Sequence, residues 1–168
     1  TINNYLRVQI SYTDNHGTLE SFNSLATGLI NNVNDAPTGA VTISGDATED
    51  EMLTVDYANL ADADGLGDLT VQWQADSKSG VWQNILNATT DSWVLGDDQV
   101  GKSVRVKLSY TDGHGHAEAV YSAGTLKVAN INDLPVGALV IEGQVTEGET
   151  LTANTSSLSD ADGILVIS

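Results

Sequence analysis

The sequence Asn34-Asp35-Ala36-Pro37 occurs a second time, with one substitution, as Asn132-Asp133-Leu134-Pro135. The two stretches are 98 positions apart, and at this spacing residues 1–70 align with residues 99–168 without a gap. The alignment contains 29 identical pairs, and an internal repeat of this clarity outweighs any single motif. The chain is therefore predicted to be part of a tandem array. We call the two stretches the first joint and the second joint.

The 98-residue period is close to the length of an immunoglobulin-like β-sandwich, which has roughly 100 residues. The predicted units are the end of one repeat (residues 1–33), one complete repeat (34–131) and the start of a further repeat (132–168). We expect the natural protein to contain more copies. Neighbouring repeats of the same chain are then the first expected partners of each unit.

The composition is strongly acidic, with 23 Asp and Glu against 6 Lys and Arg and a net charge of −17. This charge argues against nucleic acid and anionic membrane surfaces as partners, because both attract basic proteins. No apolar run has transmembrane length, so no membrane insertion is predicted. The chain has no cysteine, which excludes disulfides and thiolate ligands. Cations are the expected partners, and a bound metal ion is a candidate source of stiffness.

Apolar residues alternate with polar ones in short runs, and no stretch keeps a helical apolar stripe for three turns. The pattern predicts an all-β fold, with the complete repeat forming an immunoglobulin-like seven-strand antiparallel β-sandwich. The expected strands contain residues 41–43, 53–57, 69–75, 81–86, 92–95, 104–110 and 117–129. Trp73 alternates in phase with Val71 and Ala75, so we expect its ring inside the sandwich.

Acidic loops are expected at both ends of the sandwich. In this topology, the loops after the second and sixth strands lie at the end where the chain enters the sandwich. The loops after the first and fifth strands lie at the opposite end, where the chain leaves it. Candidate metal ligands are Asn34, Asp35, Asp62, Asp64 and Asp112 at the first joint, and Glu49, Asn132, Asp133, Asp160 and Asp162 at the second. Two carboxylates ~5 Å apart repel by ~3 kcal/mol at an effective dielectric constant near ~20. Calcium, a hard cation that takes six to eight oxygen ligands, is the predicted counter-charge.

Several features of the repeat resemble one family. They are the joint at 33–37, the loop at 60–67, the strand at 71–74 and the run at 98–101 that leads into 104–112. Together they resemble the immunoglobulin-like extender repeats of very large bacterial adhesins of the repeats-in-toxin class, which type I secretion systems export. The resemblance implies a secreted spacer at the bacterial cell surface, stiffened by calcium between its repeats.

The joint and the loop Asp62-Ala63-Asp64-Gly65 are also similar to the calcium-binding linkers of cadherins, although the Asp-Arg-Glu element of cadherins is missing. Unlike antibody domains, the chain has no cysteine pair around Trp73. A metal-independent spacer stays open, since Asp and Gly favour turns and proline stiffens linkers without any ion. A further alternative is a binding module that engages a surface glycan or protein through its loops or through an exposed Trp82. Two exposed, coplanar rings of Trp82 and Trp93 would favour this alternative.

Other chemistry has weaker support in the sequence. Asp112, His114 and His116 suggest a transition-metal site, but His116 is replaced by Thr18 in the first copy. No nucleophile-elbow sequence activates a serine, so no enzyme activity is predicted. The leading hypothesis is therefore a structural spacer with calcium at its joints, and the distal ligand of the adhesin is not predicted.

Overall fold

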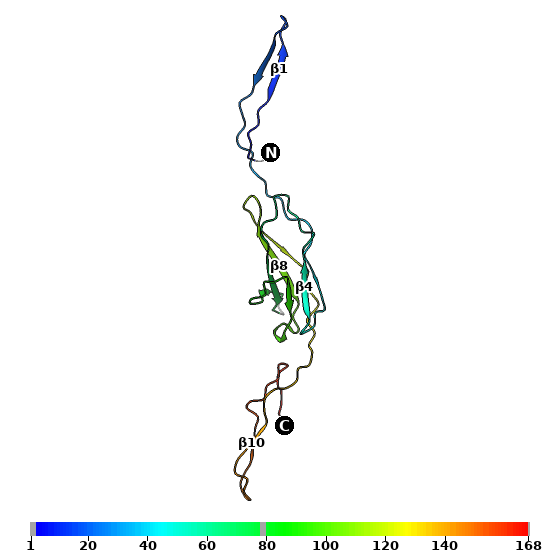
Figure 1. The fold of residues 1–168 in the computed structure, drawn as a ribbon, viewed down its shortest axis with the longest axis vertical. Coiled ribbons are helices and arrows are strands. Elements are labelled where there is room, and N and C mark those ends of the chain that lie inside the picture. Colours follow the sequence, from blue (N-terminus) through cyan, green and yellow to red (C-terminus); the bar gives the residue numbers. More distant parts are fainter. Residues whose placement is uncertain (1–2, 78–79, 168) are drawn as a thin grey trace.

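The computed structural model describes residues 3–77 and 80–167, so the outermost residues of the predicted units, 1–2 and 168, lie outside it. Its strands confirm the all-β prediction, and Figure 1 shows them in three successive parts of an elongated molecule. The outer parts are hairpins of β1 (Gln9–Thr13) with β2 (Leu19–Asn23), and of β10 (Val140–Glu142) with β11 (Thr152–Asn154). The central part contains the remaining strands.

Two antiparallel sheets form the central part. The strands are β3 (Thr42–Ser44), β4 (Met52–Asp56), β5 (Thr70–Asp76), β6 (Trp82–Asn84), β7 (Ser92–Val94), β8 (Val104–Thr111) and β9 (Ala117–Tyr121), with a 3₁₀ turn, η1 (Asp97–Gln99). One sheet has the order β3-β4-β7 and the other β6-β5-β8-β9. Within them Leu53 pairs with Trp93, and Trp73 pairs with Val106.

The core lies between these sheets. Its fully buried apolar side chains include Leu53, Trp73, Leu95, Val104, Val106 and Leu108. The indole N–H of Trp73 donates to the carbonyl of Thr90 at 2.8 Å, so burial leaves no unpaired donor on this ring. Alternation along β5 and β8 therefore predicted the inward residues correctly, because successive strand residues point to opposite faces.

The last strand is shorter than predicted. Alternation suggested a strand over 117–129, whereas β9 ends at Tyr121. After that point hydroxyl groups replace backbone carbonyls as acceptors: Ser122 Oγ accepts from Val106 N, and Thr125 Oγ1 accepts from Val104 N, both at 2.9 Å. The strand expected over 81–86 is likewise reduced to β6.

The same hydroxyl arrangement recurs in the first hairpin, as the repeat requires. Ser24 Oγ accepts from Val8 N, and Thr27 Oγ1 accepts from Leu6 N, both at 3.0 Å. Ser24 and Thr27 are 98 positions before Ser122 and Thr125. The hairpin β1–β2 therefore reproduces the geometry of β8–β9, and the sequence repeat is a structural repeat here.

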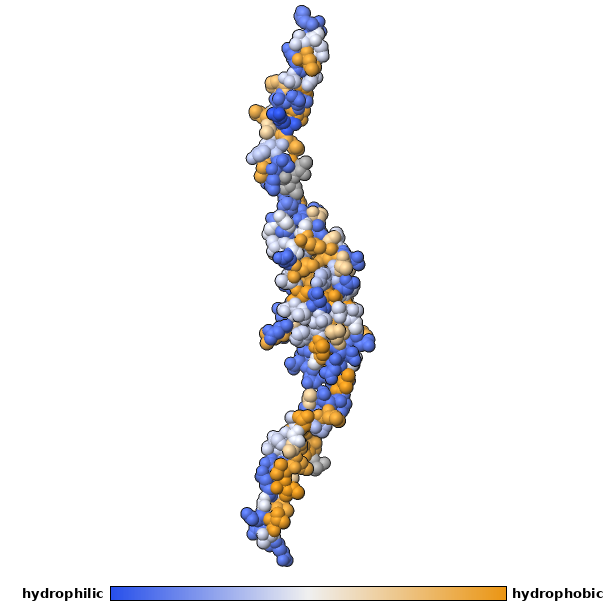
Figure 2. Space-filling view, viewed as in Figure 1, coloured by the Kyte–Doolittle hydropathy of each residue, from blue (hydrophilic) through white to orange (hydrophobic). Residues whose placement is uncertain are grey.

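The outer hairpins differ from the central part in what covers them. Ile10 is 57 % exposed, whereas its repeat equivalent Leu108 is 0 % exposed. No second sheet packs on β1–β2 or on β10–β11 within the described part of the chain. Figure 2 shows apolar surface along both ends of the molecule, and the two hairpins therefore display sheet faces that the central part buries.

The fold predicts that two tryptophans contribute very differently to stability. Trp73→Ala should lower the free energy of unfolding by about 3–5 kcal/mol, since it empties a fully buried site. Trp82→Ala should cost less, because Trp82 lies on the outer face of β6 and is only half-buried. Urea titration of the two variants checks this. Equal losses would contradict the inward and outward assignment.

Candidate metal centre

Glu49 is the buried acidic residue of the second joint. It lies in the loop between β3 and β4, and its backbone N–H donates to the carbonyl of Ala129 at 2.9 Å, which fixes the loop on the departing chain. The residue is 1 % exposed. Its Oε2 accepts from the backbone N–H of Ile131 at 3.1 Å, whereas its Oε1 is buried and has no hydrogen-bond partner among the described residues. A buried acceptor without a donor is costly, so this oxygen is suited to a cation.

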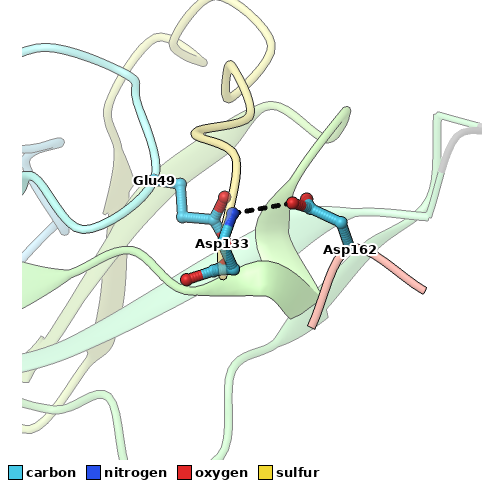
Figure 3. Close-up of side chains that lie close together, drawn as sticks. All are labelled: Glu49, Asp133 and Asp162. Atoms are coloured by element: carbon cyan, nitrogen blue, oxygen red, sulfur yellow. Dashed lines mark hydrogen bonds between the residues drawn. The ribbon is translucent and has the colours of Figure 1, made fainter. Parts of the chain in front are cut away.

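Two further carboxylates face Glu49. Carboxylate oxygens of Glu49, Asp133 and Asp162 all lie within 4.8 Å of one another (Figure 3). Asp162 Oδ2 also accepts from the backbone N–H of Asp133 at 2.8 Å, drawn as the dashed line. Asp162 is placed by its own turn, where its backbone N–H donates to Asp160 Oδ1 at 3.0 Å. The cluster therefore joins the central part, the second joint and the part that follows.

No basic side chain balances this cluster. Within residues 3–77 and 80–167, the two ion pairs join His114 to Asp64 and His116 to Asp112, in loops away from this cluster. No Lys or Arg in these residues forms an ion pair with a carboxylate. Asp97, at the start of η1, raises the pKa of Glu49 because the two carboxyl groups are close enough to share a proton. Burial raises the pKa of Asp133, and the charges of Asp97 and Asp162 raise it further. Without a bound cation, the carboxyl groups of Glu49 and Asp133 therefore keep their protons to higher pH than isolated carboxyl groups do.

The first joint has the same backbone contact. The backbone N–H of Asp35 donates to Asp64 Oδ2 at 2.7 Å, 98 positions before the equivalent contact of Asp133 with Asp162. Asp64 in turn is placed by Asp62 Oδ1, which accepts from its backbone N–H at 2.8 Å. Asn34 Nδ2 donates to Glu118 Oε1 of β9 at 2.8 Å. The joint is thereby attached to the part of the chain that follows it.

The loops after β4 and β8 meet at this first joint, as the topology predicted. The backbone N–H of Gly113 donates to the carbonyl of Asp64 at 3.0 Å. A Cβ atom on Gly113 would lie 2.6 Å from that carbonyl oxygen, so a side chain there would force the two loops apart. The phenolic hydroxyl of Tyr110 donates to Asp62 Oδ2. Burial is the main cause that raises the pKa of Tyr110, and the hydrogen bond to Asp62 raises it further.

Asp112 belongs mainly to its own loop. Its Oδ1 accepts from the backbone N–H groups of His114 and His116, each at 2.8 Å. Burial opposes ionisation of Asp112, but these backbone donors outweigh it and lower the pKa. His114 contacts Asp64 at 3.9 Å, and His116 contacts Asp112 at 3.3 Å. The two histidines thus contact different carboxylates.

The ten predicted ligands therefore have different roles. Glu49, Asp133 and Asp162 bring their carboxylates together, whereas Asp62, Asp112 and Asp160 hold loop turns through their side chains. Asn132 Nδ2 donates to the carbonyl of Asp133 at 2.9 Å, whereas only its Oδ1 could be a ligand of a cation. Asp97 was not among the ten predicted ligands, although it lies in the loop after the fifth predicted strand, which the sandwich topology places at the second joint.

Trp82 and Trp93 do not form the coplanar pair that would have favoured the alternative binding hypothesis. Trp82 lies on β6 and Trp93 on β7, which belong to different sheets. Trp93 is partly buried and packs against the core. One face of Trp82 lies on the guanidinium group of Arg105, at 4.4 Å from the ring centroid. The two rings therefore offer no common platform.

A comparison with protein-family models found no match, and neither did a comparison with curated protein sequences. Among the described residues, no helix has the length and apolar character needed to cross a membrane.

The carboxylate cluster predicts an unusual titration of Glu49. Because Asp97 raises its folded-state pKa, ionisation of Glu49 opposes folding, and this opposition grows as pH rises through that pKa. In chelator, the side-chain carbon NMR signal of Glu49 should therefore titrate with a midpoint above 4.5. Asp97→Asn should lower the midpoint, whereas Asp98→Asn, the matched control, should not. A wild-type midpoint at or below 4.5 would contradict the described geometry.

Proposed function

We propose that this chain is a structural spacer of a secreted adhesin at the bacterial cell surface, built from tandem immunoglobulin-like repeats and stiffened by calcium at their joints. One observation carries the proposal. The contact of Asp35 with Asp64 recurs as that of Asp133 with Asp162, and at the second joint the buried Glu49 completes a cluster of carboxylates. Secretion and the surface location rest on the resemblance to extender repeats.

Strand order supports the immunoglobulin-like part of the proposal. The sheet β3-β4-β7 corresponds to strands A, B and E of such a domain, and β5, β8 and β9 correspond to C, F and G. The fourth strand, β6, pairs with β5 rather than with the three-stranded sheet, so it departs from the constant-type arrangement. The chain ends of the central part lie at opposite ends of the sandwich, which suits an end-to-end array (Figure 1).

The hydrogen bonds of the second joint locate its flexible point. Ile131 donates its backbone N–H to Glu49 of the central part, and Asp133 donates its backbone N–H to Asp162 of the following part. Only Asn132 lies between these two attachments. An ion held by Glu49 and Asp162 closes a ring across Asn132, so it restricts the one residue about which the two parts can bend.

The donor set favours calcium over softer metals. All three clustered side chains supply carboxylate oxygens, and the chain has no thiol. Calcium takes oxygen ligands in flexible geometry, and backbone carbonyls and water complete its shell. The cation would also offset the negative charges of Asp97 and Asp162, which, after burial, raise the pKa of Asp133 in its absence.

Calcium should raise the melting temperature of the chain, because an ion that binds only the folded form stabilises it by mass action. When the free calcium concentration is a hundred times the dissociation constant, the free energy of unfolding rises by about 2.7 kcal/mol. Glu49→Gln and Asp162→Asn should each remove most of the gain, since each takes one charge from the cluster. Asp98→Asn is the matched control and should keep the full gain.

Differential scanning calorimetry in calcium and in chelator measures these shifts. Identical melting curves for the wild-type chain under both conditions would contradict calcium binding and leave a metal-independent spacer. A gain that survives both Glu49→Gln and Asp162→Asn would place the ion elsewhere.

A further inference from the structure

Arg105 lies between two aromatic rings on the outer face of the four-stranded sheet. Its guanidinium carbon is 4.4 Å from the ring centroid of Trp82 and 4.5 Å from that of Tyr121. Its Nε donates to Gln74 Oε1 at 2.9 Å, and Gln74 Nε2 donates to Asn84 Oδ1 at 2.8 Å. Contacts from three neighbouring strands thus hold the guanidinium plane in one orientation, at little further entropic cost to a ligand.

The charge of Arg105 is not used within the chain. No carboxylate lies within ion-pair distance of it in the described residues, although the chain has 23 acidic residues. Its two Nη nitrogens also have no hydrogen-bond partner in the described residues. An oriented guanidinium fork with free donors is the group that best matches a carboxylate, because it can form two parallel hydrogen bonds.

A shallow groove on the same face is lined by Lys107, the next outward residue after Arg105 on β8. Arg105, Lys107 and Ser109 alternate outward on β8, so the face extends about 13 Å from the first to the third. The groove has a volume of about 470 Å³. Its lining consists of Thr70, Lys107, Ser109, Tyr110, Thr111, Ala117 and Ala119 together with the carboxylates of Asp68 and Glu118. Tyr121 pairs with Lys107, and its ring is 46 % exposed. The face therefore combines hydroxyl groups, small side chains, one exposed ring and two cations, and the groove also has two carboxylates in its lining.

We propose that this face binds a glycan that carries a single carboxylate, as a terminal acidic sugar does. Arg105 holds the carboxylate, Tyr121 contacts a sugar ring, and the hydroxyl-lined groove accepts neutral sugar units. A polyanion is disfavoured because the chain has a net charge of −17, which repels extended negative charge. An acidic peptide is disfavoured because it would bring several carboxylates to a groove whose lining already contains Asp68 and Glu118.

The repeat supplies a matched control. Arg7 is the equivalent of Arg105 in the preceding unit, but the equivalent of Tyr121 is Asn23, so Arg7 has no ring on that side. The site should therefore belong to the central part alone. It is also independent of the joints, since none of its residues belongs to the carboxylate cluster.

The test uses 3′-sialyllactose as the probe and lactose as the probe without a carboxylate. Both are titrated into the full chain while backbone amide NMR shifts of β8 and β9 are followed, in calcium and in chelator. We expect saturable shifts with sialyllactose under both conditions and at least tenfold weaker binding of lactose. Arg105→Gln should weaken sialyllactose binding at least tenfold, Arg105→Lys should weaken it to a smaller extent, and Arg7→Gln should leave it unchanged.

Several results would overturn the proposal. They are the absence of saturable shifts, equal binding of the two sugars, and unchanged binding by Arg105→Gln. Tighter binding of a glutamate-rich peptide than of sialyllactose at the same face would assign it to a protein partner instead. If Arg105→Gln does not fold, Lys107→Gln decides the matter, since full binding by that folded variant would exclude the groove. Glycan binding is expected in chelator as well as in calcium. Failure of the glycan proposal is therefore distinguishable from failure of the calcium proposal.

Discussion

Repulsion between carboxylates at the second joint is the physical constraint on which this account depends. Glu49 is buried with one oxygen lacking any donor, and it faces Asp133 and Asp162. Neither burial nor proximity favours ionised carboxylates, as the raised pKa values of Glu49 and Asp133 reflect. A bound cation would offset these unfavourable charges, so under the calcium proposal the stiffness of the second joint depends on the ion concentration.

The β-sandwich serves this arrangement by fixing the loops. The core around Trp73 and Leu108 holds the two sheets together, and the sheets place acidic loops at both ends of the long axis. The attachments of Ile131 and Asp133 leave only Asn132 free between the parts. A stiff body with one adjustable residue at its end is suited to a spacer, because the angle between bodies then depends on a few contacts.

Much of this could be predicted from the sequence, for physical reasons. Strict alternation in Val104-Arg105-Val106-Lys107-Leu108 determines which side chains enter the core, and the 98-residue repeat transfers each assignment from one copy to the next. The meeting of the loops followed from topology. The end of β9 at Tyr121 could not be predicted, because hydroxyl acceptors that replace a ladder depend on side-chain rotamers. Complete burial of Glu49 was equally hidden, since acidic residues are rarely buried.

The distance between two labels on either side of Asn132 tests the central claim most directly. The chain has no cysteine, so Gln83→Cys and Val145→Cys allow specific spin labelling of the central part and of the following part. Double electron–electron resonance should give a broad distance distribution in chelator and a narrow one in calcium, while a Gln83→Cys and Lys127→Cys pair within the central part stays unchanged. Glu49→Gln should keep the distribution broad in calcium. A distribution of equal width with and without calcium would contradict the account.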